Sequence, residues 1–242
     1  MTIQRNIPLA SQVAGLLRKR LRRDHVEGGQ IPGEIELAEE LDVSRGTVRQ
    51  ALTILDREGV IYRRQGSGTF ANKHVLHIGA RVEHAYEFTD LIRLSGFEAA
   101  IMPLEVTHEP AWDEAVERLE IEPDTEMLAV RKLFLADGEP AIYCIDTLPV
   151  SSIHAPYDEK ELHAPIFEFL ARRCHQHVDY ILADILLEAA GEQLAELLDL
   201  SFHDVVLRFD ETSYNKANKP VLYSRIYYRA DRIHFSVLRK KV

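Results

Sequence analysis

The sequence contains only two cysteines, Cys144 and Cys174, and one tryptophan among its 242 residues. Two cysteines do not make a disulfide framework, so we expect a protein of a reducing compartment, the cytoplasm. No apolar run is long enough to cross a bilayer, and residues 1–8 lack the hydrophobic stretch of a signal peptide. The composition, 46% hydrophobic and 28% charged, is that of an ordinary folded protein. The length is enough for one large domain or two modest ones.

The chain also lacks the positive charge expected of a nucleic-acid-binding protein, because its formal net charge is −10. The charge is unevenly distributed. Residues 1–75 contain 12 Lys and Arg against 9 Asp and Glu, a net charge of +3, whereas residues 76–242 contain 17 against 30, a net charge of −13. We therefore expect the N-terminal part to contact nucleic acid and the acidic part to stay away from it. The acidic residues alternatively serve only to keep the protein in solution.

Two short helical patterns, joined by a tight turn at residues 42–43, indicate a helix-turn-helix. Ser44 is placed to cap the second helix, and the apolar residues behind it fall on one helical face: Val48, Ala51, Leu52 and Leu55. Arg45, Thr47 and Arg49 stand on the other faces. Such a helix suits the major groove of DNA, although the same pattern alone also describes a solvated surface helix.

A glycine-punctuated hairpin at residues 61–71 follows the second helix. Its basic residues stand beside glycines, so its backbone could approach a phosphate chain closely. Residues 9–23 form a further helical pattern with a basic outer face, which is either solvated or in contact with the DNA backbone. Arg5, ahead of this helix, is another candidate for a phosphate contact.

Together these elements resemble the winged helix-turn-helix of the GntR family of bacterial transcription regulators. The resemblance rests on Pro32, Glu34, Glu36-Leu37-Ala38, Val43-Ser44-Arg45, Thr47 to Leu52, Leu55, Glu58-Gly59 and Arg64 to Phe70. It implies that the recognition helix contacts DNA and that the wing around Gln65 reaches the minor groove. The candidate DNA-binding residues, besides Arg5, are Ser44, Arg45, Thr47, Arg49, Arg64, Gln65, Gly66, Ser67, Gly68 and Thr69. One departure matters: the family usually has a DNA-contacting arginine where this chain has Ile35, so one expected contact is missing.

The second part of the chain mixes strand and helix patterns. Asp137-Gly138 and residues 215–219 each separate two strand-like runs, so we predict two hairpins, 127–136 with 141–148 and 205–214 with 221–229. A last strand is predicted over 232–239, and helices are predicted over 89–94, 112–119, 165–174 and 191–198. Hairpins interspersed with helices indicate an α+β domain with a mainly antiparallel sheet.

This part resembles the effector-sensing UTRA domain of the HutC subgroup of the same family, which is similar in fold to chorismate lyase. The matching stretches are Glu87-Phe88-Thr89, Leu135 to Pro140, Leu148-Pro149 and Pro220 to Arg232. The resemblance implies a small-molecule effector in a pocket against the sheet, and a homodimer. It divides the chain into a winged helix-turn-helix domain (1–71), a linker (72–80) and a UTRA domain (81–242).

Strand alternation places four residues on one face of their strand: Tyr223, Arg225, Tyr227 and Arg229. It places Lys132 and Phe134 on one face of another strand. Aromatic walls with one or two cations suit a pocket for a small anion or a sugar, although cross-strand packing explains the same pattern. The candidate effector-binding residues are Glu87, Thr89, Lys132, Phe134, Tyr143, Tyr223, Arg225 and Tyr227.

The candidate pocket departs from that of relatives that sense phosphosugars. Those relatives have a serine at the position of Glu87 and arginines at the positions of Lys132 and Phe134, and these groups hold a phosphate. A carboxylate beside a phosphate would cost about a few kcal/mol. We therefore hypothesise that the effector is not a phosphosugar. A ligand with an amine, or one with an apolar body and a single anionic group for Lys132, fits better.

These features favour a ligand-responsive transcription factor that binds a pseudo-palindromic operator as a homodimer. Repression relieved by ligand is the commoner mode of the family. Two alternatives are an enzyme, given the chorismate lyase-like domain, and an architectural DNA-binding protein without an effector. The sequence has no nucleophile elbow, phosphate loop or metal motif, and the histidines near Cys174 match no strong zinc spacing. We expect no metal, no cofactor and no enzymatic activity.

Overall fold

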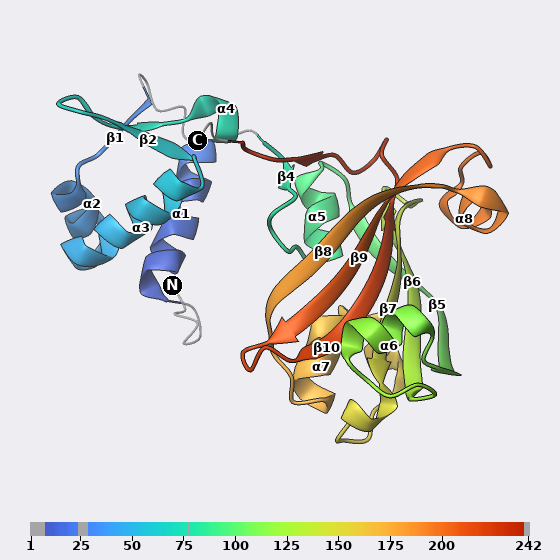
Figure 1. The fold of residues 1–242 in the computed structure, drawn as a ribbon. Coiled ribbons are helices and arrows are strands. Elements are labelled where there is room, and N and C mark those ends of the chain that lie inside the picture. Colours follow the sequence, from blue (N-terminus) through green and yellow to red (C-terminus); the bar gives the residue numbers. More distant parts are fainter. Residues whose placement is uncertain (1–7, 24–28, 77, 240–242) are drawn as a thin grey trace. The chain divides into compact units, whose positions relative to one another are not determined.

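The computed structural model describes residues 8–23, 29–76 and 78–239, which form two compact units (Figure 1). The second unit is Val82–Phe235, and the first comprises the described residues on either side of it. The described residues of the predicted linker, 72–76 and 78–80, therefore lie with the first unit. The reason is burial: Val75 and Leu76 pack into the core of that unit. Among the described residues, no helix is both long and apolar enough to cross a membrane.

The first unit consists of a helical core with a small three-stranded antiparallel sheet, in the strand order β1-β3-β2. Its elements are α1 (Leu9–Arg23), β1 (Gln30–Ile31), α2 (Glu34–Leu41), α3 (Arg45–Arg57), β2 (Ile61–Arg64), β3 (Gly68–Ala71) and α4 (Lys73–Leu76). The apolar stripes of the three long helices meet in one core, in which Leu17, Leu37 and Leu55 are buried. The predicted first helix, helix-turn-helix and hairpin are confirmed.

The second unit is built on a six-stranded antiparallel sheet with the strand order β5-β6-β7-β10-β9-β8. Its strands are β5 (Ala99–Pro110), β6 (Glu126–Ala136), β7 (Glu139–Pro149), β8 (Val178–Ala189), β9 (Val205–Asn215) and β10 (Pro220–Tyr228). Its helices are α5 (Phe88–Leu94), α6 (Asp113–Leu119), α7 (Ile166–Arg173) and α8 (Gly191–Leu198), with two 3-10 turns, Val150–Ser152 and Glu159–His163. The predicted α+β class is confirmed.

The helices cover both faces of this sheet. Leu128, Val130 and Leu222 pack against α7 on one face, where Phe88 of α5 also contacts Phe134. On the other face, α8 packs against Leu133 and its neighbours, and α6 packs near Tyr223. Successive residues along each strand point to opposite faces of the sheet and therefore belong to different hydrophobic cores.

The two predicted hairpins are confirmed as β6–β7 and β9–β10. At the first turn, Asp137 and Gly138 both have positive φ, 52° and 85°, as a two-residue hairpin turn requires. The predicted last strand is wrong in length, since only β11 (Phe235–Ser236) forms, paired with β4 (Ala80–Arg81). The strands β5 and β8 were not predicted. Both are edge strands with exposed residues on either face, so they lack the alternation of a half-buried strand.

Candidate DNA-reading surface and effector cavity

The predicted recognition residues stand at the N-terminal end of α3. Ser44 caps this helix, because its Oγ accepts a hydrogen bond from the backbone N–H of Thr47 at 3.1 Å. Arg45 and Arg49 follow with side chains that are 58% and 56% exposed. Val48, on the back of the same helix, is fully buried. The helix is therefore anchored by its apolar face and presents its donors to solvent.

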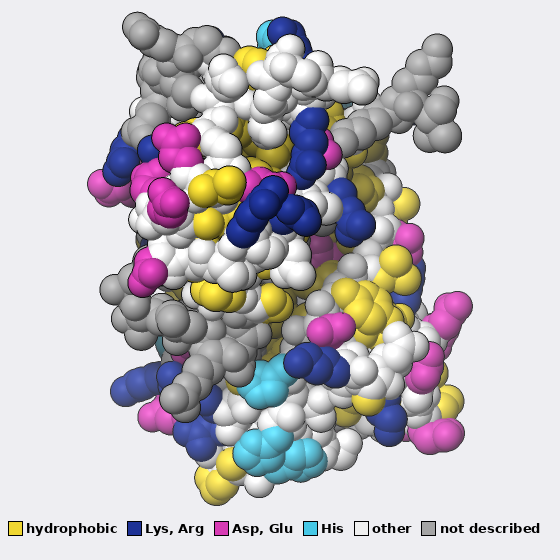
Figure 2. Space-filling view, turned by 90° about the vertical axis from the view of Figure 1, so that its left-hand side faces the viewer, with side chains coloured by type: hydrophobic (Ala, Val, Ile, Leu, Met, Phe, Trp, Pro, Cys, Tyr) yellow, Lys and Arg dark blue, Asp and Glu magenta, His cyan; other side chains and the backbone are white. Residues whose placement is uncertain are grey.

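Glu34, the first residue of α2, contacts both arginines. Arg45 donates from Nε at 3.1 Å, and Arg49 donates from Nε at 3.2 Å and from Nη2 at 3.0 Å. The hydrogen bond from Arg49 lowers the pKa of Glu34, and the same bond raises the pKa of Arg49. The carboxylate thus holds two guanidinium groups in place and leaves further N–H donors on each. Basic and acidic side chains stand together on this side of the unit (Figure 2).

The wing is the hairpin of β2 and β3, and its tip, residues 65–67, is exposed. Arg64 lies over two stacked rings, 5.4 Å from the centroid of Tyr62 and 5.2 Å from that of Phe70. These contacts stabilise the hairpin next to its tip. Gly66 and Gly68 have φ of 74° and 108°, a backbone region that side chains rarely adopt.

The remaining DNA-binding candidates have different positions. Gln65 and Ser67 lie exposed at the wing tip, where the Ser67 carbonyl accepts a hydrogen bond from Gln30 at 3.2 Å, and Thr69 is half-buried in β3. Arg5 lies outside the described residues. Ile35 is 60% exposed on α2. An apolar side chain therefore stands on the same surface as Arg45 and Arg49.

The second unit contains a cavity of about 50 Å³ between the sheet and the segment 82–91. Its lining comes from β6, β7, β10, β9 and β8 on the sheet side, and from α5, the start of α7 and Phe235 around it. A cavity of this volume holds a few water molecules. It is the place in this unit where polar side chains converge beneath an aromatic cover.

A buried ion pair lies at the floor of the cavity. Lys132 Nζ lies 3.4 Å from Asp146 Oδ2 and donates to the Ala164 carbonyl at 3.1 Å. Ser224 Oγ donates to Asp146 Oδ1 at 2.7 Å, and the Cys144 thiol donates to the same oxygen at 3.3 Å. Lys132 and Asp146 are only 1% and 2% exposed. The lysine charge is therefore compensated by a partner with its own supporting hydrogen bonds.

Two further carboxylates line the same cavity. Burial, together with the negative charge of Asp146, raises the pKa of Glu211 to about 7. The pKa of Glu87 is raised by the same two causes in the same order, against a smaller lowering by Lys132. Neither side chain has a hydrogen-bond or ion-pair partner among the residues that the structure describes. The cavity consequently holds more carboxylates than cations.

Aromatic rings form the rest of the wall. Phe88 of α5 contacts Phe134 edge-on, with ring centroids 4.8 Å apart, and also approaches Tyr228. Tyr228 contacts Phe209 and Phe235, each at 5.0 Å. Burial raises the pKa of Tyr228, so its hydroxyl stays protonated. The acidic groups therefore face a largely apolar, aromatic surface.

Three of the predicted effector-binding residues line this cavity: Glu87, Lys132 and Phe134. Thr89 is half-buried in α5 and does not line it. The other four, Tyr143, Tyr223, Arg225 and Tyr227, lie on the opposite face of the sheet and so are not brought together with the first three. Alternation correctly grouped Tyr223, Arg225 and Tyr227, but Ser224 and Tyr228 are the residues of β10 that reach the cavity.

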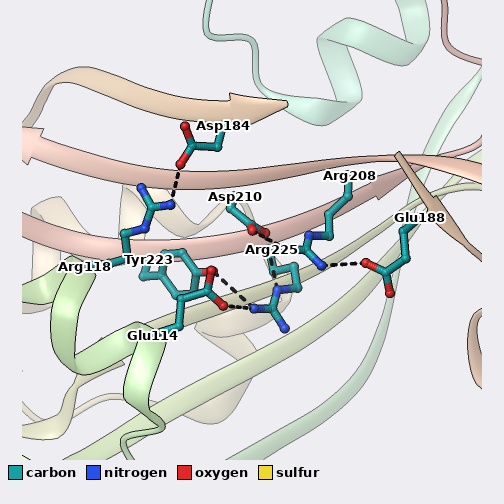
Figure 3. Close-up of polar contacts among 8 residues, drawn as sticks. All are labelled: Glu114, Arg118, Asp184, Glu188, Arg208, Asp210, Tyr223 and Arg225. Carbon is teal, nitrogen blue, oxygen red and sulfur yellow. Dashed lines mark hydrogen bonds and ion pairs between the residues drawn. The ribbon is translucent and has the colours of Figure 1, made fainter. Parts of the chain in front are cut away.

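On that opposite face, Arg225 belongs to a network of charges under α6, and Tyr223 lies beside it (Figure 3). Arg225 pairs with Glu114 of α6 and with Asp210 of β9, the latter at 3.3 Å. Arg208 donates to Asp210 at 2.7 Å and to Glu188 at 2.6 Å. Arg118 pairs with Asp184 of β8. The arginines here pair with protein carboxylates, and the pairs join α6 to three strands.

The tyrosines on this face are held by packing. Burial raises the pKa of Tyr223 to about 12, and its ring lies 6.2 Å from that of Trp112. Tyr143 and Tyr227 stack with centroids 5.9 Å apart. Cross-strand packing, the alternative explanation of the aromatic pattern, therefore describes Tyr143 and Tyr227, whereas Tyr223 packs against the start of α6.

Sequence reasoning missed Asp146, Glu211 and Ser224 as cavity residues. A signal exists for Asp146, because it is an acidic residue inside a strand that is mainly apolar. Charges at such positions need a buried partner or a ligand. In the part of the chain that the structure describes, no group of three or more His, Cys, Asp or Glu residues is arranged to hold a metal ion.

A winged helix-turn-helix joined to a sheet domain with an enclosed polar cavity defines a DNA-binding transcription regulator with an effector domain. Comparison with known families gives the same result. Residues 9–71 match the model of the bacterial regulatory proteins of the gntR family, and residues 95–234 match that of the UTRA domain. The chain belongs to the UTRA-containing regulators of the gntR family, and it is a transcription regulator.

Individual relatives are similar over nearly the whole chain. The HTH-type transcriptional regulator Rv0792c of Mycobacterium tuberculosis is 27% identical over 96% of this chain and 86% of its own. A probable fructoselysine utilization operon transcriptional repressor of Escherichia coli K12 is 26% identical over 93% of both chains. The crystal structure of YydK from Bacillus subtilis shares the fold, with a TM-score of 0.76 and 20% identity over 97% of this chain and 100% of that one.

Proposed function

We propose that the protein is a repressor that binds a pseudo-palindromic operator as a homodimer and releases it when an effector occupies the cavity of the second unit. The observation that carries the proposal is the arrangement of Arg45 and Arg49, both held by Glu34 at the exposed start of α3. Fixed, partly free guanidinium groups beside a wing suit base edges and phosphates. We further propose that the protein acts in the cytoplasm, together with its DNA partner.

Footprinting on the DNA flanking its own gene tests this proposal. We expect one protected operator with two half-sites about one helical turn apart, the spacing of two recognition helices in a two-fold dimer. Binding without sequence preference and with a steep salt dependence would instead favour an architectural protein.

The edge strand β8 supports the homodimer. Three of its large apolar residues, Leu182, Ile185 and Leu187, are 54%, 51% and 75% exposed. The other edge, β5, contains prolines and a register shift between Pro103 and Glu105, which disfavour pairing with another strand. We propose that β8 pairs with β8 of a second copy about a two-fold axis. Leu187→Glu should then produce monomers in analytical ultracentrifugation, whereas a dimer with unchanged affinity would refute this interface.

The acidity of the cavity supports an effector other than a phosphosugar. Lys132 already has Asp146 as a partner, and Glu87 and Glu211 add negative charge. A phosphate placed there would meet repulsion of about a few kcal/mol. Differential scanning fluorimetry against a panel of metabolites tests this, and strong stabilisation by hexosamine phosphates would overturn it.

We propose that the second unit senses its ligand and does not convert it. Chorismate carries two carboxylates, and this cavity offers no Lys or Arg free of a carboxylate partner among its described lining residues. Burial also raises the pKa of the Cys144 thiol well above its usual value, which disfavours the reactive thiolate. Incubation of the purified protein with chorismate, followed by product analysis, tests the enzymatic alternative. Turnover would refute the proposal.

A further inference from the structure

The carboxyl groups that line the cavity outnumber its lysines and arginines. Lys132 is the one Lys or Arg among the described residues of the lining, and Asp146 neutralises it. Glu87 and Glu211 remain, and neither has a hydrogen-bond or ion-pair partner among the described residues. They approach the cavity from different elements, the residue before α5 and the strand β9. A positive group placed in the cavity would therefore meet carboxylates from two elements.

We propose that the cavity takes a ligand with a protonated amine, which Glu87 and Glu211 receive while the rings of Phe88, Phe134 and Tyr228 enclose it. This inference rests on the proposed function, because it names the chemical class of the effector of the same cavity. It also distinguishes between the two ligand types that the sequence left open, an amine and an apolar molecule with one anionic group.

An anionic ligand would have to compete with Asp146 for Lys132. The ammonium group of Lys132 is only 1% exposed and already has two oxygen partners, the Asp146 carboxylate and the Ala164 carbonyl. Asp146 is itself fixed by Ser224 at 2.7 Å. Breaking this pair would leave a buried carboxylate without its cation, which is strongly unfavourable. Lys132 therefore stabilises the floor of the cavity and is not available to bind a ligand.

An ammonium group matches both kinds of wall. It forms charge-assisted hydrogen bonds with carboxylates, and these are about twice as strong as hydrogen bonds between neutral groups. Its charge is also attracted to the faces of aromatic rings, and Phe88 and Phe134 stand 4.8 Å apart at this site. A neutral alcohol of the same size would gain neither the charge pairing nor the attraction to the rings. The difference in binding between an ammonium ion and the alcohol of equal size therefore tests the inference directly.

The test uses a series of compact probes, because the cavity volume is only about 50 Å³. Primary alkylammonium ions from methylammonium to butylammonium are added to the full-length protein at tens of millimolar, with the alcohol of equal chain length as the control. We expect at least one ammonium ion to raise the melting temperature by about 2–4 °C at saturating concentration, and the matching alcohol to leave it unchanged. Equal shifts for ion and alcohol, or no shift with any ion, would overturn the inference.

Variants locate the binding. Glu87→Gln and Glu211→Gln preserve the shape of each side chain and remove its charge, so each should weaken binding of the effective ion by about tenfold or more in calorimetry. Glu122→Gln removes the charge of an exposed glutamate outside the cavity and should leave the affinity unchanged. Undiminished binding by both cavity variants would refute the assigned residues.

A second readout separates this inference from the proposed function. The effective ion is titrated into the complex of the protein with its operator, followed by fluorescence anisotropy. Binding that requires Glu87 and Glu211 and releases DNA supports both conclusions. Binding that requires them without changing operator affinity supports the ligand class and refutes effector-controlled repression. Release of DNA by a metabolite that needs neither carboxylate refutes the ligand class and leaves the repressor in place.

Discussion

The carboxylate of Glu34 and the guanidinium of Arg49 form a two-point contact between α2 and α3, with Arg49 Nε at 3.2 Å and Nη2 at 3.0 Å. The contact crosses the turn of the helix-turn-helix and fixes the plane of the guanidinium group. A fixed plane matters for DNA reading, because bidentate recognition of a base edge depends on the orientation of the two donors. Both charges are stabilised by the pairing, which lowers the pKa of Glu34 and raises that of Arg49.

Replacement of Arg49 by alanine should weaken operator binding by about 10- to 100-fold, as the loss of a good base contact does. The side chain is more than half exposed, so we expect the melting temperature to stay nearly unchanged. Fluorescence anisotropy with operator and with unrelated DNA measures both affinities. The matched control is Arg57→Ala, which replaces an exposed arginine at the other end of α3 and should lower operator affinity much less. Unchanged operator affinity in Arg49→Ala would refute the assignment.

Glu34→Gln should lower operator affinity several-fold even though it removes a negative charge from a DNA-binding surface. The reason is that Arg45 and Arg49 lose the carboxylate that orients them, and ordering them on binding then costs conformational entropy. Binding to unrelated DNA should strengthen slightly, because that depends on net charge. The control is Glu36→Gln on the same helix, which should strengthen binding both to the operator and to unrelated DNA. A rise in operator affinity for Glu34→Gln would show that the pairing does not assist recognition.

Gly68→Ala should lower the stability of the wing and the affinity for the operator more than Gly66→Ala does. Both glycines have positive φ, which costs an alanine about 1 kcal/mol. At Gly68 a Cβ would also lie 2.9 Å from Gln30 Nε2, whereas at Gly66 it would meet nothing within 4 Å. Displacing Gln30 breaks its hydrogen bond to the Ser67 carbonyl. Urea unfolding and operator affinity measure the effects, and equal losses in the two variants would contradict this account.

The stability of the protein should depend on pH through Glu211. Its folded pKa of about 7 lies above the value of 4.5 for an ordinary glutamate, because burial disfavours the charged form. The stability that this group contributes is therefore complete below about pH 4.5 and is lost as pH rises toward 7. Urea unfolding of wild type at pH 5 and pH 8 should show a fall of up to about 3 kcal/mol relative to Glu211→Gln. Parallel pH profiles for the two proteins would refute the shift.

Lys132→Met should destabilise the second unit by about 3 kcal/mol at neutral pH, because Asp146 would remain buried without its cation. Replacing both partners, in Lys132→Met with Asp146→Leu, should recover much of that loss, since the uncompensated charge is then gone. Unfolding in urea measures both. If the double variant is less stable than the single variant, the pair contributes more than charge compensation.

Local patterns predicted the first unit well. The cap at Ser44, the apolar face behind Val48 and the glycines of the wing each depend on interactions within a few residues, and the structure contains all of them. The two hairpins were predicted for the same reason, since a two-residue turn such as Asp137-Gly138 fixes its own strand pairing.

Longer-range features were predicted less well. The edge strands β5 and β8 were not predicted because neither has one buried and one exposed face. The strand predicted over 232–239 shortened to Phe235–Ser236, which pairs only with the two residues of β4. In each case the partner strand, and not the sequence of the segment, decided the outcome.

The sequence by itself determined the DNA-reading elements and the grouping of Tyr223, Arg225 and Tyr227 on one face, because helix and strand periodicity are properties of the local backbone. Only the tertiary structure decided which face of the sheet encloses the cavity. It is set by where α5 and α7 pack, and that packing joins Glu87, Lys132 and Phe134 to Asp146, Glu211 and Ser224 from other strands. The pairing of Lys132 with Asp146 changes a cavity that would suit an anion into one with an excess of carboxylates.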